Sequence, residues 1–272
     1  MSSFPRGSGI LLHPTSLPGP HGIGTFGAPA REFVDFLAES GQRWWQMLPL
    51  GPTGYADSPY QCLSTFAGNP MLIDLGDLVE RGLLTKRELQ PLTGLSTASV
   101  DYAGVIHAKR PLLAKAYARF AADGDRASHA AWAHFRRQHA RWLNDFALFM
   151  AMKDVRGGKA WVHWPTAWRD RRETALKTFA EKEQERVAAH QFFQFLFFTQ
   201  WAALRRYARE RNIRIIGDLP LYVAHDSSDA WSDRRNFLLR PDGRPRQVAG
   251  VPPDYFSRTG QLWGNPIYHW RY

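Results

Sequence analysis

Three short apolar runs, each followed by a segment rich in proline and glycine, most strongly limit the fold of this chain. They are Gly9–Leu12, Trp44–Leu48 and Ile213–Gly217. The first two are separated by a glycine-rich loop and by Ala28–Ser40, whose apolar spacing, early proline and following glycine predict a helix. A strand, a helix and a second strand in succession form a βαβ unit, which implies parallel strands with functional residues at their carboxyl ends. The sequence therefore predicts an α/β protein.

A largely helical block, residues 76–211, interrupts this alternation. Its apolar spacing predicts helices over Leu78–Leu89 (two short pieces), Pro111–Ala122, Ala127–Met152 and Lys177–Arg211. Pro111 stands at the expected start of its helix, where proline is tolerated. We therefore expect three regions: residues 1–75 with two barrel-type strands and a further short strand at Leu72–Ile73, an inserted helical subdomain over 76–211, and residues 212–272 with the third barrel-type strand and the substrate-covering loop.

Composition excludes several classes of protein. The single cysteine, Cys62, rules out an internal disulfide framework and a multi-cysteine zinc site. The most apolar run, Phe192–Phe198, is too short and too interrupted to cross a bilayer. The polar start of the chain does not resemble a secretory leader, so we expect a cytoplasmic protein. The histidines at 134, 139, 163 and 190 show no carboxylate at ligand spacing, which favours packed or surface roles and no metal.

Charge raises a nucleic-acid-binding alternative. The net charge is +10 and the isoelectric point is near 10.0. The arginines are, however, spread along predicted helices that also carry core aromatics, and no known nucleic-acid-binding motif accompanies them. Phosphate-binding, dinucleotide and nucleophile-elbow motifs are also missing from the sequence.

The segment Gly250–Pro266 combines three prolines and three glycines with three aromatic side chains. Prolines remove backbone donors and glycines favour turns, so we expect a long loop. Its aromatic content argues against disorder. Flat rings beside amides suit a polyhydroxylated ligand, whose faces are apolar and whose edges are polar; the alternative is a loop packed on its own rings.

Three loops, Gly54–Tyr60, Asp218–Tyr222 and Asp254–Asn265, are expected to converge on one face, and each carries a carboxylate that is a candidate for chemistry. Asp57, Asp218 and Asp254 follow or lie within them, and glycoside hydrolysis or transfer uses a pair of carboxyl groups. Asp218, directly after an expected strand, favours a functional role. Asp57, before Ser-Pro, favours a turn or cap role, and Asp254 is compatible with either.

Four long motifs resemble the amylomaltases, the disproportionating 4-α-glucanotransferases of glycoside hydrolase family 77. They read GILLHPTSLPGPHGIGTFG, WWQMLPLGPTGYADSPYQCLSTFAGNP, IGDLPLYVAHDSSDAW and GVPPDYFSRTGQLWGNPIY, in order along the chain. The resemblance implies a (β/α)8 TIM barrel with helical insertions and no cofactor. It also implies transfer of α-1,4-glucan segments between maltooligosaccharides or starch-type glucans, through a covalent β-glycosyl-enzyme intermediate.

The same resemblance assigns roles to individual residues. Ser58 and Tyr60 match residues that contact the donor sugar, Tyr55 matches an accessory glucan-stacking position, and Asp218 matches a sugar-hydroxyl-binding aspartate. The substrate-covering loop of the family is matched by Asp254, Tyr255, Phe256, Gln261, Trp263 and Asn265. A cover of this kind would exclude water and so favour transfer over hydrolysis.

The resemblance also implies that no catalytic acid is among these residues. The family's nucleophilic Asp, acid/base Glu and stabilising Asp are expected beyond residue 272. Only three barrel-type strands can be recognised, whereas eight close a barrel, so we expect a partial barrel with unpaired strand edges. The alternative function is a non-catalytic glucan-binding remnant or regulator.

Overall fold

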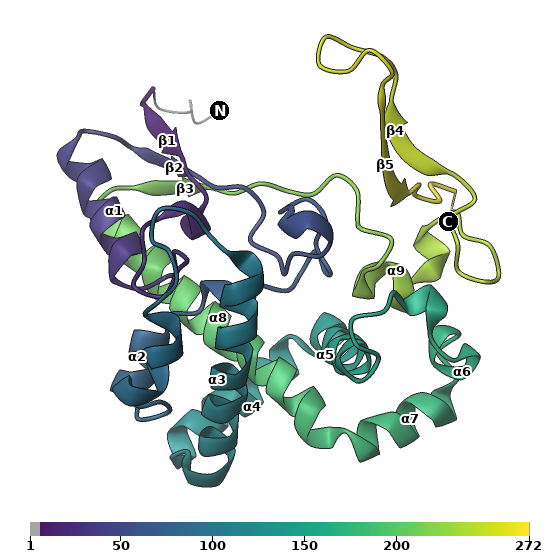
Figure 1. Cartoon of the computed structure of the whole chain (residues 1–272), viewed down its shortest axis with the longest axis horizontal. Helices are drawn as coiled ribbons and strands as arrows, with labels where there is room; N and C mark the ends of the chain where they lie inside the picture. Colours follow the sequence, from purple (N-terminus) through teal and green to yellow (C-terminus); the bar gives the residue numbers. More distant parts are fainter. Residues whose placement is uncertain (1–5, 272) are drawn as a thin grey trace. The chain divides into compact units, whose positions relative to one another are not determined.

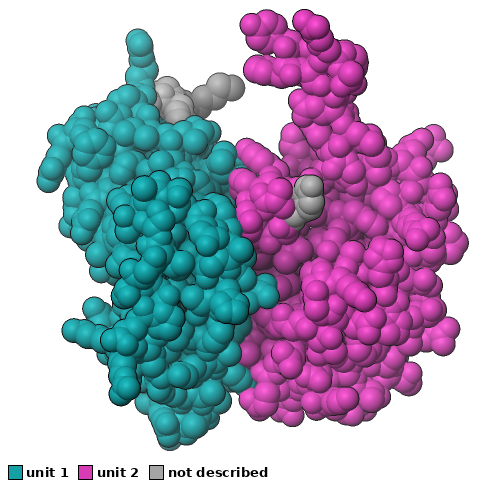
Figure 2. All heavy atoms as spheres, viewed as in Figure 1, with its two compact units in different colours: residues 1–50, 68–135, 192–219 teal, residues 51–67, 136–191, 220–272 magenta. Residues whose placement is uncertain are grey.

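The computed structural model describes residues 6–271, except for the side chain of Tyr55. It is an α/β structure in which helices predominate and the strands are short (Figure 1). The chain divides into two compact units (Figure 2). Unit 1 contains residues up to 50, 68–135 and 192–219, and unit 2 contains residues 51–67, 136–191 and 220 onward.

The elements of the described residues are as follows. The α-helices are α1 Ala28–Glu39, α2 Leu75–Glu80, α3 Tyr102–Asp123, α4 Arg126–Gln138, α5 Ala140–Val155, α6 Thr166–Arg169, α7 Glu173–Lys182, α8 Gln184–Glu210 and α9 Ser228–Ser232. The strands are β1 Gly9–Leu11, β2 Trp44–Gln46, β3 Arg214–Ile216, β4 Val248–Val251 and β5 Gln261–Pro266.

The sheet of unit 1 confirms the three predicted strands and their parallel pairing. Its order is β1-β2-β3, with Trp45 opposite Ile10 on one side and Ile215 on the other. Trp45 is fully buried, and its indole N–H donates to the carbonyl of Leu12 at 2.8 Å. Gly9 allows the close approach of β1, because a Cβ there would meet Trp44 at 2.5 Å.

The apolar sequences of the outer strands lead us to expect buried strands, and this expectation is only partly confirmed. Ile213, just before β3, is buried. Leu11 is 54% exposed, and Ile215 and Ile216 are only half-buried. Within the described residues β1 and β3 each pair with β2 alone, so each has one unpaired edge. An edge strand leaves part of its side-chain surface in water.

The helix α8 holds the segment 68–74 through two buried amide side chains. Gln194 accepts from the N–H of Gly68 at 2.7 Å and donates to its carbonyl at 2.9 Å. Gln200 makes the same pair of bonds to Asp74, at 2.7 and 3.1 Å. A Cβ at position 68 would meet the ring of Phe197 at 2.1 Å, so only glycine lets the backbone lie this close. The buried aromatics expected on this helix are confirmed.

The core of unit 2 is built from large aromatic rings. Trp161 and Trp231 are fully buried, and Trp164 packs edge-on against Trp231 with ring centroids 5.7 Å apart. At its border the ammonium of Lys153 on α5 pairs with the carboxylate of Asp226 at 2.6 Å. These contacts fix the segment 220–232, which leads toward the hairpin β4–β5.

Several expected boundaries are corrected. The helix predicted to begin at Pro111 begins at Tyr102, because Asp101 caps it by accepting from the N–H of Gly104 at 3.0 Å, and Pro111 lies inside it. The helix expected over 127–152 is broken at His139, and the one over 177–211 is broken at Glu183.

Two segments also change their type. The strand expected at Leu72–Ile73 is part of a 3₁₀ turn over Pro70–Leu72, capped by Asn69. The expected loop Gly250–Pro266 is mainly an antiparallel hairpin, because Pro252 and Pro253 fall in the connecting turn, outside the ladder.

Candidate functional site

In unit 2 the loop 51–67 folds back on itself and presents a short turn. An antiparallel bridge joins Thr53 to Cys62, and the N–H of Gly54 donates to the carbonyl of Gln61 at 2.9 Å. At the tip lies a 3₁₀ turn, Tyr55–Asp57, in which Ala56 and Asp57 have φ values of 55° and 52°. Left-handed backbone at non-glycine residues is costly and is concentrated at functional sites, so this turn is a site candidate on geometry alone.

The predicted sugar-contacting residues of this loop lie at its surface. Tyr60 is 45% exposed, and its backbone N–H donates to the hydroxyl of Ser58 at 3.3 Å. Asp57 accepts from the hydroxyl of Thr53 at 3.3 Å, which agrees with the expected turn role. The side chain of Tyr55 lies outside the described residues, so its stacking role stays a prediction.

Behind its surface the loop is anchored to α9. The carboxylate of Asp229 accepts from the backbone N–H and the hydroxyl of Thr65, at 3.0 and 2.8 Å. Burial raises the pKa of Asp229, and the two bonds from Thr65 oppose that shift. Burial also raises the pKa of the Cys62 thiol to about 12. The thiol donates to the carbonyl of Pro59 at 2.7 Å, so Cys62 is a packing residue here.

The base of the hairpin β4–β5 is fixed by Asn265. This side chain is only 4% exposed, donates to the carbonyl of Val223 at 2.8 Å and accepts from the amide of Gln61 at 3.2 Å. Its one amide group thereby ties together β5, the segment 220–225 and the loop 51–67, all within unit 2. The loop and the hairpin that the sequence expected on one face are therefore brought together.

Aromatic side chains lie beside this amide. The Trp263 ring lies edge-on to Tyr222 at 6.1 Å, and its indole N–H donates to the side chain of Gln261 at 3.1 Å. Tyr222 also stacks with Tyr268 at 6.2 Å. Trp263 remains 43% exposed, so it offers part of its ring to solvent from a held position.

The tip of the hairpin, residues 252–260, is different. Asp254 accepts from the backbone N–H groups of Phe256 and Ser257, at 2.9 and 2.8 Å, and so shapes the turn. Tyr255 is 97% exposed and Phe256 is 87% exposed, with their rings in edge-on contact at 5.6 Å. Two large aromatic side chains exposed to water on one turn are typical of a surface that contacts a ligand or another molecule.

Asp218 belongs to unit 1. It follows β3 by two residues, at the carboxyl end of the parallel strand as predicted, and it is exposed. Its carboxylate accepts from the N–H of Leu219 at 2.7 Å. Its expected meeting with the loops of unit 2 stays a prediction.

Two residues that support the site were not predicted. Gln61 and Asp229 hold the loop through partners that stand 204 and 164 positions away in the chain. The type of a polar residue, whether in a loop as Gln61 or on a helix as Asp229, gives no sequence signal for a partner at that distance. His190 also has a carboxylate partner that its spacing did not show, because its Nε2 lies 2.7 Å from Asp154.

The side chains that the loop 51–67 and the hairpin base bring together are suited to binding a ligand. Residues 6–271 contain no group of three His, Cys, Asp or Glu side chains that would hold a metal ion. No helix in the same range is long and apolar enough to cross a membrane. The loop and the hairpin base offer part-exposed rings next to amide and hydroxyl groups, an arrangement that suits a ligand with apolar faces and polar edges.

Comparison with known families gives one match over nearly the whole chain. Residues 12–272 match the family described as 4-alpha-glucanotransferase, glycoside hydrolase family 77. Among curated proteins, the 4-alpha-glucanotransferase of Thermus thermophilus is 52% identical over 268 residues, which are 98% of this chain and 53% of that protein. The 4-alpha-glucanotransferase of Synechocystis is 48% identical, over 97% of this chain and 53% of that protein.

Solved structures agree with this match. The amylomaltase of Streptococcus agalactiae in complex with acarbose superposes with a TM-score of 0.94 at 44% identity, over 98% of this chain and 54% of that one. The amylomaltase of Corynebacterium glutamicum, at 20% identity and a TM-score of 0.75, shares the fold. The chain thus spans about half the length of the relatives that it matches.

Proposed function

Since the chain belongs to the 4-alpha-glucanotransferase family, glycoside hydrolase family 77, we propose that it supplies the glucan-binding part of a 4-α-glucanotransferase. The substrates are maltooligosaccharides and starch-type α-1,4-glucans. The observation that carries the proposal is the anchored hairpin base, where Asn265 bonds to Gln61 and Val223 beside the part-exposed Trp263.

A glucan has the chemistry that this arrangement suits. The C–H faces of its pyranose rings are apolar and pack on aromatic rings, while its hydroxyl groups need hydrogen-bonding partners at the ring edge. Tyr60 and Trp263 offer the rings, and Ser58 and Gln261 offer the polar groups. Tyr55 is proposed as a further stacking position. Asp218 is proposed to accept hydrogen bonds from two sugar hydroxyls, as its carboxylate oxygens allow.

The tip of the hairpin is proposed to cover the bound glucan. Tyr255 and Phe256 are held by a turn that Asp254 shapes, and their rings lie almost wholly in water without a glucan. Closing over the sugar would bury both rings and remove water from the reacting bond. The exclusion of water favours transfer to another glucan hydroxyl over hydrolysis.

The bond exchange itself is proposed to follow a retaining double displacement, by resemblance to the family. Its nucleophilic Asp, acid/base Glu and stabilising Asp are assigned to the part of the relatives' length that this chain does not span. In the retaining mechanism a carboxylate forms a covalent glycosyl intermediate, and the acceptor hydroxyl then releases it. The residues of this chain that are named above bind and orient the glucan.

The parallel sheet β1-β2-β3 is proposed to be the first part of a (β/α)8 barrel, with residues 76–211 inserted as a helical subdomain. Three parallel strands that lie side by side in chain order support this proposal, as does the outer edge of β3, which pairs with no other strand of the described residues. In such a barrel the carboxyl ends of the strands carry the active site, which is where Asp218 follows β3.

Calorimetric titration with maltoheptaose tests the binding proposal. We expect saturable binding by the unmutated chain and an affinity at least about tenfold weaker in Trp263→Ala. Leu262→Ala is the matched control, because Leu262 is the adjacent residue of β5, is 81% exposed and is not assigned to the site. A folded chain that shows no saturable binding, or equal weakening by both substitutions, would contradict the proposal.

Product analysis after incubation with maltotriose tests the assignment of the acids. We expect the maltotriose to remain unchanged in the presence of the 272-residue chain. The appearance of glucose and longer maltooligosaccharides would show that this chain contains catalytic acids.

A further inference from the structure

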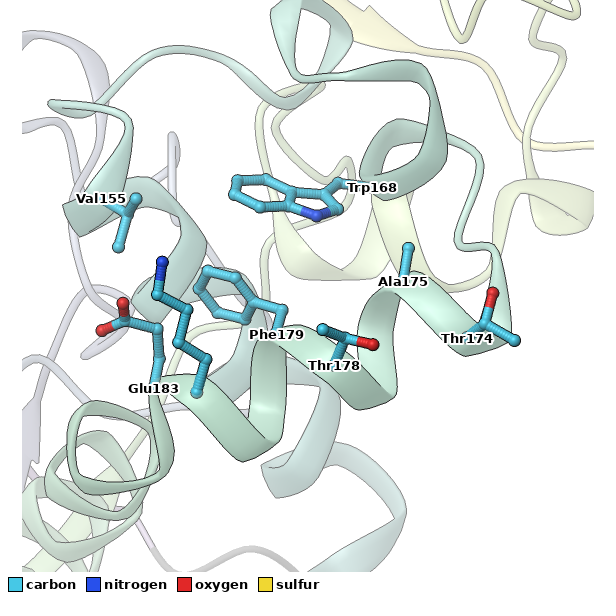
Figure 3. Close-up of a pocket in the computed structure, with 8 residues that line it drawn as sticks. Val155, Trp168, Thr174, Ala175, Thr178, Phe179 and Glu183 are labelled. Carbon is cyan, nitrogen blue, oxygen red and sulfur yellow. The ribbon is translucent and has the colours of Figure 1, made fainter.

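A pocket lies in unit 2 between α6, α7 and the end of α5. The function proposed above does not use it. It encloses about 370 Å³, which is within the range of small-ligand sites. Figure 3 shows the rings of Trp168 and Phe179 next to each other, with Ala175 and Thr178 along α7. We propose that this pocket is a second α-glucan-binding site, which holds one glucosyl ring of a long chain.

The aromatic platform of this pocket is rigid. The Trp168 ring meets Phe179 edge-on, with centroids 4.8 Å apart. The backbone carbonyl of Trp168 accepts from the buried indole N–H of Trp231 at 3.0 Å, which anchors α6 to the core. Trp168 itself is only half-buried. A preorganised ring that is partly open to water gives a sugar face a packing surface without an ordering cost.

Polar groups stand around that platform. Thr174 and Thr178 are four residues apart on α7, so they lie on one face of the helix, and both are exposed. Across the pocket, Glu183 is held by an ion pair with Arg186 at 3.1 Å. A hydroxyl donates and accepts, and a carboxylate accepts, so the rim matches the ring of hydroxyl groups on a glucosyl unit.

The small side chain of Ala175 leaves the space open. It lies on α7 four residues before Phe179, and both line the pocket. A larger residue at this position would fill the pocket without removing any packing that the core needs. This property allows a test that does not depend on deleting Trp168.

The inference rests on the proposed function, because the ligand class is that of the proposed substrate, but its test is separate. Maltoheptaose is titrated into Trp263→Ala and followed by saturation-transfer NMR of the sugar protons. The first site is weakened in this variant, so we expect a residual saturable signal from the pocket. Adding Ala175→Leu or Trp168→Ala should raise the dissociation constant obtained from that signal about tenfold or more, and a tenfold change corresponds to about 1.4 kcal/mol. Thr178→Val should weaken it by less.

The outcomes separate the two proposals. If Trp263→Ala alone removes all binding, the pocket is not a glucan site and the proposed function stands. If Ala175→Leu and Trp168→Ala both leave the residual signal unchanged in folded protein, the pocket is again excluded. If cyclohexanol competes as well as maltose does, the pocket selects an apolar ring over a sugar and the inference is wrong. If the unmutated chain does not bind maltoheptaose at all, the proposed function itself is contradicted.

Discussion

The base and the tip of the hairpin β4–β5 share one stretch of sequence but differ in how they are held. At the base, Asn265 is 4% exposed and makes two side-chain hydrogen bonds to other segments of unit 2. At the tip, Tyr255 is 97% exposed, and its ring contacts that of its neighbour Phe256. The difference shows that the same mixture of aromatic and polar residues is anchored where segments cross-link and lies in water where they do not. The proposed function assigns the anchored part to glucan binding and the exposed part to the cover.

Asn265→Ala is the most damaging change that this comparison predicts. It leaves the carbonyl of Val223 and the amide of Gln61 without their partner, and each unpaired buried group costs about 1–3 kcal/mol. We expect the free energy of unfolding to fall by about 3 kcal/mol, measured by urea denaturation. Gln61→Ala, which breaks one of the two bonds, should cost less. Equal stability of Asn265→Ala and the unmutated chain would show that the base is not anchored in this way.

Thiol reactivity contrasts the tip with the loop 51–67, to which the base of the hairpin is bonded. Burial raises the pKa of Cys62 to about 12, so at pH 8 its reactive thiolate is scarce, and its alkylation in the folded chain should increase with pH. A cysteine introduced by Tyr255→Cys would be exposed, with an ordinary pKa near 8.5. We expect iodoacetamide to modify it at least about a hundredfold faster than Cys62 at pH 8. Comparable rates at the two positions would contradict the difference in burial.

Gly260→Ala probes where the tip joins β5. Gly260 has φ +75°, and a Cβ there would meet the carbonyl oxygen of Val251 at 2.5 Å. We expect a local cost of about 2 kcal/mol, seen as faster amide hydrogen exchange in residues 248–262. The matched control is Gly264→Ala, where φ is +79° and nothing lies within 4 Å of the added Cβ. Gly264→Ala adds backbone strain but no steric clash, so it should destabilise the hairpin less than Gly260→Ala does.

The double substitution of Tyr255 and Phe256 by alanine should have the smallest effect on folding. Both rings lie in water, so the free energy of unfolding should change by less than about 0.5 kcal/mol. Maltoheptaose binding should weaken about tenfold, because the cover loses the surface that it would bury on the sugar. A large loss of stability with unchanged binding would reverse the roles assigned to tip and base.

The sequence predicts the elements whose signals are local. The three parallel strands follow from apolar runs next to glycine and proline, and α1 follows from Pro29 and Gly41 at its ends. The sequence predicts a loop in place of the hairpin because the segment is rich in proline and glycine, and no local signal shows that Pro252 and Pro253 fall in the connecting turn. The helix start at Asp101 was missed in favour of Pro111, although Asp is a strong N-cap residue.

The sequence predicts candidate site residues but not their contacts. Aromatic and amide side chains in proline-rich loops identify Tyr60, Trp263 and Asn265 as candidates. The bond from Gln61 to Asn265 spans 204 positions, and only the folded backbone brings such partners together. The same holds for Thr65 and Asp229. For this reason the sequence indicates which segments are candidates for binding, while the structure separates the anchored base of the hairpin from its exposed tip.

Hydrogen exchange of the chain with and without maltoheptaose tests the central claim most directly. The account predicts that amides of the tip, residues 252–260, exchange fast without sugar and gain protection when maltoheptaose is bound. Amides of the base, where Gly250 pairs with Leu262 and Val251 with Gln261, should be protected in both conditions. If saturating maltoheptaose leaves the exchange of the tip unchanged, the hairpin is not the cover of a glucan site and the account is wrong.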